Sequence, residues 1–202
     1  VATPIGNLED VTLRALRVLR EVSLIAAEDT RRTAKLLAHY DIRTPTTSFY
    51  EQVEHKKTPH LLSRLAAGSP VALVSDAGTP GISDPGYRLV AAAVAAGMRV
   101  EAVPGPSSVL AALVSSGLPT HSFSFVGFPP PRAQARERWL AGLAGRSETL
   151  VMFEAPHRLA ETLGAMHLML GDRPIVLARE LTKVHEELVR GPISAVIDRL
   201  PS

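Results

Sequence analysis

Val71-Ala-Leu-Val74, followed by Ser75-Asp-Ala-Gly-Thr-Pro-Gly-Ile-Ser-Asp-Pro-Gly86, joins a short apolar run to a loop of small residues, and a helical pattern begins directly after it. The glycines and prolines remove side-chain bulk and fix backbone angles, so main-chain N–H and C=O groups can approach a ligand closely. The same order recurs where residues 100–103 run into Pro104-Gly105-Pro106-Ser107-Ser108 and an apolar helical pattern. We therefore predict two strand–loop–helix junctions at one edge of a sheet.

Short apolar or β-branched runs alternate with helical patterns along the whole chain, which is typical of an α/β fold with a largely parallel sheet. The pattern pauses at Gly117-Leu118-Pro119-Thr120, and the second series of elements predicts a mixed sheet. We expect two α/β domains, 1–119 and 120–202. The predicted strands are 22–27, 71–74, 99–103, 123–126, 149–153, 175–178 and 186–190, and the predicted helices are 30–40, 59–67, 87–96, 109–114, 133–144, 158–170 and 193–200.

The composition of the 202-residue chain narrows its function class. It has no cysteine, which excludes disulfides and thiolate metal sites and is compatible with a reducing cytoplasm. The seven histidines are scattered without an i, i+4 pair, so we predict no metal. The longest apolar segment, 89–98, is far shorter than the roughly 20 residues of a membrane span, so we predict no membrane anchor. We expect a cytoplasmic location. The chain lacks an initiator methionine, so we expect trimmed ends.

Basic side chains are clustered, although the formal net charge is only +2. Each cluster is compatible with a solvated helix face, and only convergence on one cleft would make a phosphate-binding surface. The clusters are Arg14, Arg17 and Arg20; Arg31, Arg32 and Lys35; and Arg132, Arg136 and Arg138.

The sequences of the two glycine-rich loops exclude several common kinds of binding and catalytic site. Neither loop has the GxxxxGK[ST] pattern of a phosphate loop or the GxGxxG spacing of a dinucleotide fold. Ser107 follows a proline and does not lie in a GxSxG elbow, so a hydrolase lacks its central residue. The interpretation that remains is that the loops bind a small polar cofactor mainly through backbone atoms.

A set of ordered motifs resembles the tetrapyrrole methylase superfamily. They are Thr3-Pro4-Ile5-Gly6-Asn7-Leu8, Ala77-Gly78-Thr79-Pro80-Gly81-Ile82 and Val103-Pro104-Gly105-Pro106-Ser107-Ser108. The resemblance covers nearly the whole chain and implies two α/β domains with S-adenosylmethionine in an interdomain cleft. It also implies a homodimer. The cofactor contacts that it implies, mostly through backbone atoms, are Pro4, Ala77, Gly78, Thr79, Ile82, Ser107, Ser108, Glu154 and Leu181.

Further motifs are similar to one branch of that superfamily, which methylates the ribose 2′-hydroxyl of a cytidine in 16S ribosomal RNA, the RNA of the 30S subunit. They are Ala27-Glu28-Asp29-Thr30-Arg31, Glu154-Ala155-Pro156-His157-Arg158 and Ala178-Arg179-Glu180-Leu181-Thr182-Lys183. Corrin- and haem-pathway members typically have Gly-Asp-Pro where this chain has Gly78-Thr79-Pro80. A tetrapyrrole methyltransferase is therefore the weaker alternative, and a non-catalytic RNA-binding module is another.

Methyl transfer to a hydroxyl needs the hydroxyl oxygen to be aligned with the methyl group and the hydroxyl proton to be removed. A general base that accepts this proton raises the rate by about 10² to 10⁴-fold. The catalytic candidates in the motifs are Asp29, Glu154 and Lys183, with Glu180 a further carboxylate. We favour Asp29 as the base, although Glu28 and Asp29 are equally compatible with a helix N-cap pair. The RNA-backbone candidates are Arg31, Arg32, Arg158, Arg179 and Lys183.

Overall fold

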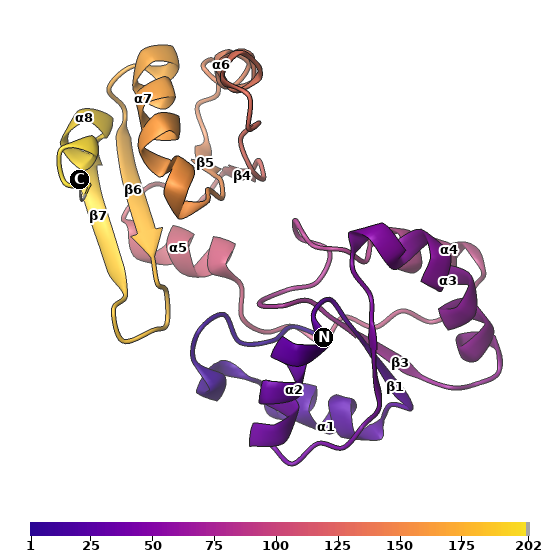
Figure 1. Ribbon diagram of the computed structural model, residues 1–202. Helices are drawn as coiled ribbons and strands as arrows, with labels where there is room; N and C mark the ends of the chain where they lie inside the picture. Colours follow the sequence, from indigo (N-terminus) through magenta and orange to yellow (C-terminus); the bar gives the residue numbers. More distant parts are fainter. Residues whose placement is uncertain (201–202) are drawn as a thin grey trace. The chain divides into compact units, whose positions relative to one another are not determined.

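The computed structural model describes residues 1–200 and consists of two compact units, Val1–Ser108 and a second unit that begins at Val109 (Figure 1). The division falls at the start of α5 (Ser108–Ser116), whereas the sequence placed it at 119/120. Arg190, in the second unit, explains the difference. Its guanidinium donates to the carbonyls of Ser116 at 3.0 Å and Ser115 at 2.5 Å and so attaches α5 to that unit.

The first unit contains a parallel sheet of order β2-β1-β3. Its central strand is fully buried and sends alternate side chains to opposite faces, as the period of a strand requires. Ile25 and Ala27 face α1 and α2, whereas Leu24 and Ala26 face α3 and α4. The elements are η1 (Leu8–Asp10), α1 (Leu13–Glu21), β1 (Leu24–Ala27), α2 (Thr30–His39), β2 (Thr46–Ser48), α3 (Glu51–Ala66), β3 (Val71–Val74) and α4 (Tyr87–Ala95).

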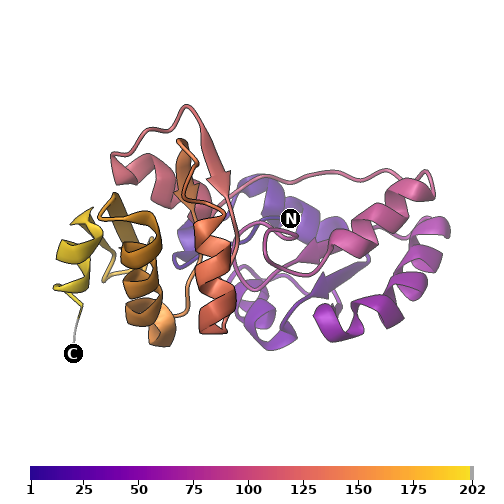
Figure 2. The same ribbon diagram turned by 90° about the horizontal axis from the view of Figure 1, so that it is seen from above.

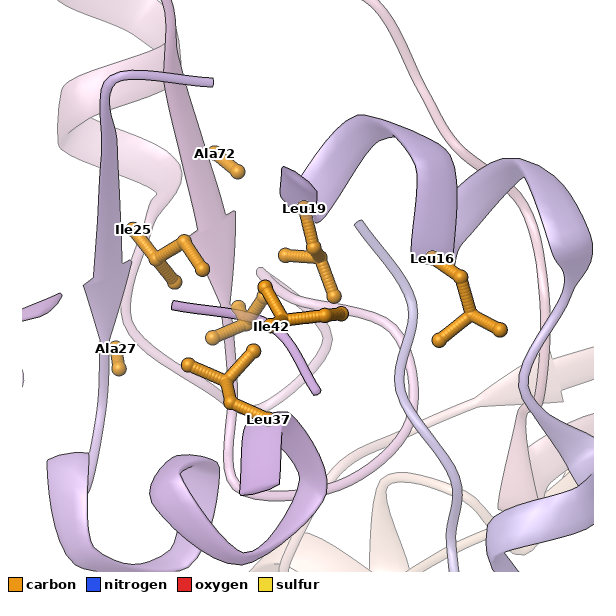
Figure 3. Packing of buried hydrophobic residues seen from close by; sticks show 8 residues of the cluster. Leu16, Leu19, Ile25, Ala27, Leu37, Ile42 and Ala72 are labelled. Carbon is orange, nitrogen blue, oxygen red and sulfur yellow. The ribbon is translucent and has the colours of Figure 1, made fainter. Parts of the chain in front are cut away.

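A hydrophobic cluster joins α1 and α2 to the sheet. In Figure 3, Leu19 of α1 and Leu37 of α2 lie beside Ile42 and Ile25. Leu19 and Ile25 are completely buried, so this cluster fixes the helices on one face of β1. The helix α2 is thereby held with its N-terminus at the end of β1, where the candidate residues Asp29 to Arg32 lie.

Three parts of the first unit differ from the sequence prediction. Residues 99–103 are irregular, although the Ala2 N–H donates to the Val103 carbonyl at 3.0 Å. The short strand β2 was missed because its three residues, two of them threonine, show no apolar pattern. The helix α3 begins before the predicted start and contains Pro59 in its interior, where sequence rules predict a helix start.

The second unit contains two separate pairs of strands within the described residues, and the predicted mixed sheet was wrong. The pair β4-β5 is parallel, and the pair β6-β7 is antiparallel. Figure 2 shows α6, α7 and α8 side by side, and Leu140, Leu163 and Val196 join them in one core. The elements are β4 (Phe123–Phe125), α6 (Ala133–Ala141), β5 (Thr149–Val151), η2 (Pro156–Arg158), α7 (Leu159–Leu170), β6 (Pro174–Arg179), β7 (Glu187–Pro192) and α8 (Ile193–Ile197).

Residues 1–200 contain neither a membrane-spanning helix nor a metal-binding cluster. No helix in that range combines the length and apolar character that a membrane crossing needs. No group of three or more His, Asp or Glu side chains there is arranged to hold a metal ion.

Candidate functional site

Three segments of the first unit meet at the start of the glycine-rich loop. Thr3 and Gly78 exchange backbone hydrogen bonds of 2.9 Å in both directions. The Thr79 hydroxyl donates to the Pro106 carbonyl at 3.2 Å, which connects the loop after β3 to the segment before Ser107. The Pro4, Gly78 and Ser107 motifs therefore converge, as the sequence predicted for these loops.

Gly78 has a backbone conformation and surroundings that a side chain would disturb. Its φ is +78°, a left-handed value that glycine adopts without a steric cost. A Cβ at this position would lie 3.3 Å from Cγ2 of Ile5 and 3.7 Å from the Pro106 carbonyl oxygen. Glycine at this position therefore lets the Ile5 and Pro106 segments pack closely against the start of the loop. Ala77 and Thr79 beside it are exposed, as is the Ile82 side chain, at 45%.

The far end of this loop is held by a buried carboxylate. Glu54 of α3 is 6% exposed, and its Oε1 accepts hydrogen bonds from the N–H groups of Gly86 at 3.0 Å and Arg88 at 3.2 Å. These donors belong to the first turn of α4 and its N-cap, which otherwise lack intrahelical partners. Glu54 therefore fixes where the loop ends and α4 begins.

An acidic group lies at the carboxyl ends of β1 and β3. Glu28 Oε2 accepts the Asp76 N–H at 3.1 Å, and Asp76 Oδ1 accepts the Asp29 N–H at 2.9 Å. Burial raises the pKa of Glu28, and the Asp76 and Asp84 carboxylates add to that rise. Burial also raises the pKa of Asp84. Arg32 forms an ion pair with Asp76 at 3.3 Å and offsets part of the negative charge of this group.

Asp29 has a different environment from that of Glu28. It is the N-cap of α2, with its Oδ1 accepting the Arg31 N–H at 2.8 Å, and its Oδ2 lies 2.9 Å from the Arg31 guanidinium. The Arg31 side chain lowers the pKa of Asp29 to about 2. A carboxylate that is so stabilised in its charged form is a weak proton acceptor.

Asp29→Asn is expected to make the free energy of unfolding depend less steeply on pH in acid solution. The lowered pKa means that Asp29 stabilises the folded state above its ordinary pKa of 3.8, and that this contribution is lost as the pH falls towards about 2. Urea unfolding of both proteins between pH 5 and pH 2 measures the effect. The free energy of unfolding of wild type should fall more steeply, and parallel curves would contradict the assignment.

In the second unit, the Glu154 carboxylate is engaged in hydrogen bonds and an ion pair within the protein. Its carboxylate accepts the Ala155 N–H at 2.8 Å and the Thr162 hydroxyl at 2.5 Å, and it lies 3.4 Å from the Arg158 guanidinium. Arg158 also donates to the carbonyls of Pro129 and Pro130. The structure thus brings two candidates together, and both side chains are engaged in joining the start of α7 to the proline-rich segment.

The remaining candidates of the second unit lie at the end of β6 and in its connection to β7. Arg179 pairs with Glu187 at 2.5 Å, and Lys183 pairs with Glu180 at 3.1 Å. Leu181 lies between Glu180 and Thr182, which both have positive φ values. Lys183 and Arg179 remain about half exposed, so each can also contact an external anion.

Four carboxyl groups at these loops, Glu28, Glu54, Asp76 and Asp84, were not predicted from the sequence as site residues. Glu28 was visible inside the motif Ala27-Glu28-Asp29-Thr30-Arg31, where paired carboxylates were a usable signal. Glu54 carried no local signal, because the hydrogen bonds that reveal its role span 32 and 34 residues.

Both the sequence and the fold are similar to those of known proteins. The sequence profile of the Tetrapyrrole (Corrin/Porphyrin) Methylases matches residues 1–197. The chain is 49% identical to "Ribosomal RNA small subunit methyltransferase I" of Halalkalibacterium halodurans, covering 98% of this chain and 68% of that protein. The protein of the same name from Synechocystis sp. is 50% identical, with coverage of 98% and 71%.

A solved structure shares the fold. It is uroporphyrin-III-C-methyltransferase from Thermus thermophilus, with a TM-score of 0.67 and 26% identity over 100% of this chain and 88% of that one. The matched profile, the relatives and the convergence of loops around Gly78 lead to one conclusion: this chain belongs to the tetrapyrrole (corrin/porphyrin) methylase family.

Proposed function

We propose that this protein transfers a methyl group from S-adenosylmethionine to small-subunit ribosomal RNA, at the ribose 2′-hydroxyl of a cytidine. The observation that carries the proposal is the meeting of the Thr3, Gly78 and Pro106 segments, which places the exposed residues Ala77 and Thr79 beside a closely packed glycine just after β3. The names of the relatives at 49% and 50% identity support the RNA substrate.

Bound S-adenosylmethionine would supply an activated methyl group on a sulfonium sulfur. The residues that would hold it in the first unit are Pro4, Ala77, Gly78, Thr79, Ile82, Ser107 and Ser108. Glu154 and Leu181 remain predicted contacts in the second unit. Fixed positioning of this kind is worth roughly 7–11 kcal/mol of the barrier in well-oriented reactions, so we assign the loop a catalytic role through positioning.

The exposed cations support an RNA partner. Arg31 and Arg32 have side chains that are 89% and 67% exposed and lie at the N-terminal end of α2. We infer that they contact phosphates together with Arg179 and Lys183, and that Arg158, at 19% exposure, does so only weakly. The proposed partner is the 30S subunit in the cytoplasm.

We also infer a homodimer. The exposed face of α4 supports this, because Tyr87, Val90 and Val94 follow helical spacing and are 77%, 39% and 60% exposed.

Incubation with labelled S-adenosylmethionine and undermethylated 30S subunits tests the proposal. Label is expected on the ribose of one cytidine, located by nuclease digestion and mass spectrometry. Because phosphate contacts release counterions, the affinity for the subunit should fall steeply as salt is raised. Cofactor binding without label on subunits or naked RNA would contradict the RNA assignment.

A tetrapyrrole methyltransferase is the second candidate. The 26% identity to uroporphyrin-III-C-methyltransferase favours it, and the exposed arginines could equally bind the carboxylates of a tetrapyrrole. Thr79 opposes it, because the corrin- and haem-pathway members typically have aspartate there. Methylation of a tetrapyrrole in place of RNA, in the same assay, would select this candidate.

A further inference from the structure

We infer that Glu28 accepts the proton of the hydroxyl that is methylated, the role for which the sequence favoured Asp29. This inference deepens the proposed function and rests on it. Three observations carry it: the position of Glu28 beside the glycine-rich loop, an oxygen without a hydrogen-bond donor, and the engagement of the other candidate bases.

The position of Glu28 is fixed from two sides. It directly follows the central strand β1, and its backbone N–H donates to the Val74 carbonyl at 3.2 Å. Its Oε2 accepts the Asp76 N–H at 3.1 Å. The side chain is therefore held against the first residues of the loop that contains Gly78, at the carboxyl edge of the sheet, where α/β proteins bind their ligands.

The second carboxylate oxygen of Glu28 is available. No donor among residues 1–200 forms a hydrogen bond with Oε1, and no cation is within ion-pair distance of the carboxylate in that range. The charged groups around it are Asp76, Asp84 and Arg32, of which Arg32 pairs with Asp76. Burial and the neighbouring carboxylates raise the pKa of Glu28, which makes its carboxylate a better proton acceptor.

The other candidate bases are already engaged. Asp29 caps α2 and pairs with Arg31, and its pKa is about 2. Glu154 accepts the Thr162 hydroxyl and the Ala155 N–H. Glu180 pairs with Lys183. Two adjacent carboxyl groups whose environments move their pKa values in opposite directions, Glu28 upward and Asp29 downward, have separate roles.

The methyl transfer balances in atoms and electrons. The ribose oxygen forms a bond to the methyl carbon as the carbon–sulfur bond of the cofactor breaks, and the electron pair of that bond stays on sulfur. The hydroxyl proton passes to Oε1 of Glu28, which later releases it to water. The bond from the Asp76 N–H to Oε2 holds the carboxyl group in place during the transfer.

Glu28→Gln is the decisive variant, because the amide oxygen can still accept the Asp76 N–H while the group no longer accepts a proton. We expect the rate of methyl transfer at saturating substrates to fall by about 10² to 10⁴-fold. The affinity for S-adenosylhomocysteine, measured by calorimetry, should stay within about threefold of wild type, since binding does not require the base. The acid limb of the pH–rate profile should disappear.

Asp29→Asn is the matched control, because it makes the same chemical change at the next residue. It should retain most of the rate and the acid limb of wild type. Loss of activity in Asp29→Asn with an active Glu28→Gln would overturn the inference and restore Asp29 as the base. Loss of S-adenosylhomocysteine binding in Glu28→Gln would also overturn it. A wild-type protein that binds the cofactor but labels no RNA would refute the proposed function instead.

Discussion

Gly78→Val is expected to lower the affinity for S-adenosylmethionine at least tenfold while the protein remains folded. Gly78 has a φ of +78°, and a left-handed conformation costs an L-residue about 1–2 kcal/mol. The new Cβ would lie 3.3 Å from Ile5 Cγ2 and 3.7 Å from the Pro106 carbonyl oxygen, so the valine side chain would displace these segments beside the exposed residues that we propose bind the cofactor. A tenfold loss of cofactor affinity corresponds to about 1.4 kcal/mol of binding free energy. A small displacement of this loop is enough to cause a loss of that size. Calorimetric titration with the cofactor measures the change.

Gly68→Val is the matched control for that experiment. Gly68 also has a φ of +78°, but a Cβ there has nothing within 4 Å, and the residue lies just after α3. Both variants should lose a similar amount of stability from the backbone strain, and only Gly78→Val should lose the cofactor. Equal cofactor affinities in the two variants would show that the Gly78 segment is not the binding loop.

Glu54→Ala is expected to lower the free energy of unfolding by about 3 kcal/mol, because it leaves the N–H groups of Gly86 and Arg88 without their acceptor. The Gly86 N–H is buried and the Arg88 N–H is partly buried, and a buried N–H that loses its partner costs about 1–3 kcal/mol. Glu54 is 6% exposed, so water does not readily replace the carboxylate. Urea unfolding measures the loss. The cofactor affinity should also fall, because the loop that ends at Gly86 is no longer held by α3.

Glu54→Gln distinguishes the hydrogen bonds from the negative charge. The amide oxygen keeps an acceptor for both N–H groups, whereas the interaction of a charge with the N-terminus of α4 is lost. That interaction is worth about 0.3–1 kcal/mol in typical cases and up to about 2 kcal/mol when partly buried. The glutamine variant should therefore retain most of the stability. If alanine and glutamine destabilise the protein equally, the charge is the main contribution.

The α/β class and the glycine-rich loop were predictable from the sequence, because both rest on local patterns. The apolar residues of β3, followed by small loop residues and the start of α4 at Tyr87, are contiguous in the chain. The motifs around Pro4, Gly78 and Ser107 could be read in the same way. Their convergence followed from the rule that strand ends meet at one edge, although 99–103 is not a strand in the structure.

Other features were decided by contacts between residues far apart in the chain. Arg190 assigns α5 to the second unit through bonds that span 74 and 75 residues. Glu54 holds Gly86 across 32 residues, and Asp76 contacts Glu28 across 48. Neither hydrophobic periodicity nor a local motif indicates contacts between residues so far apart in the chain.

Glu28 and Asp29 show the difference most directly. Their sequence identified an adjacent pair of carboxyl groups at the end of a strand, with two compatible roles, a base and a helix cap. The tertiary structure separated them: Asp29 faces its own helix and Arg31, whereas Glu28 is partly buried against Asp76 and near Asp84. A carboxyl group's pKa depends on its burial and on the charges around it, and folding sets both. The sequence alone therefore determined that two carboxyl groups stand at the end of this strand. The tertiary structure decided which of the two is suited to accept a proton.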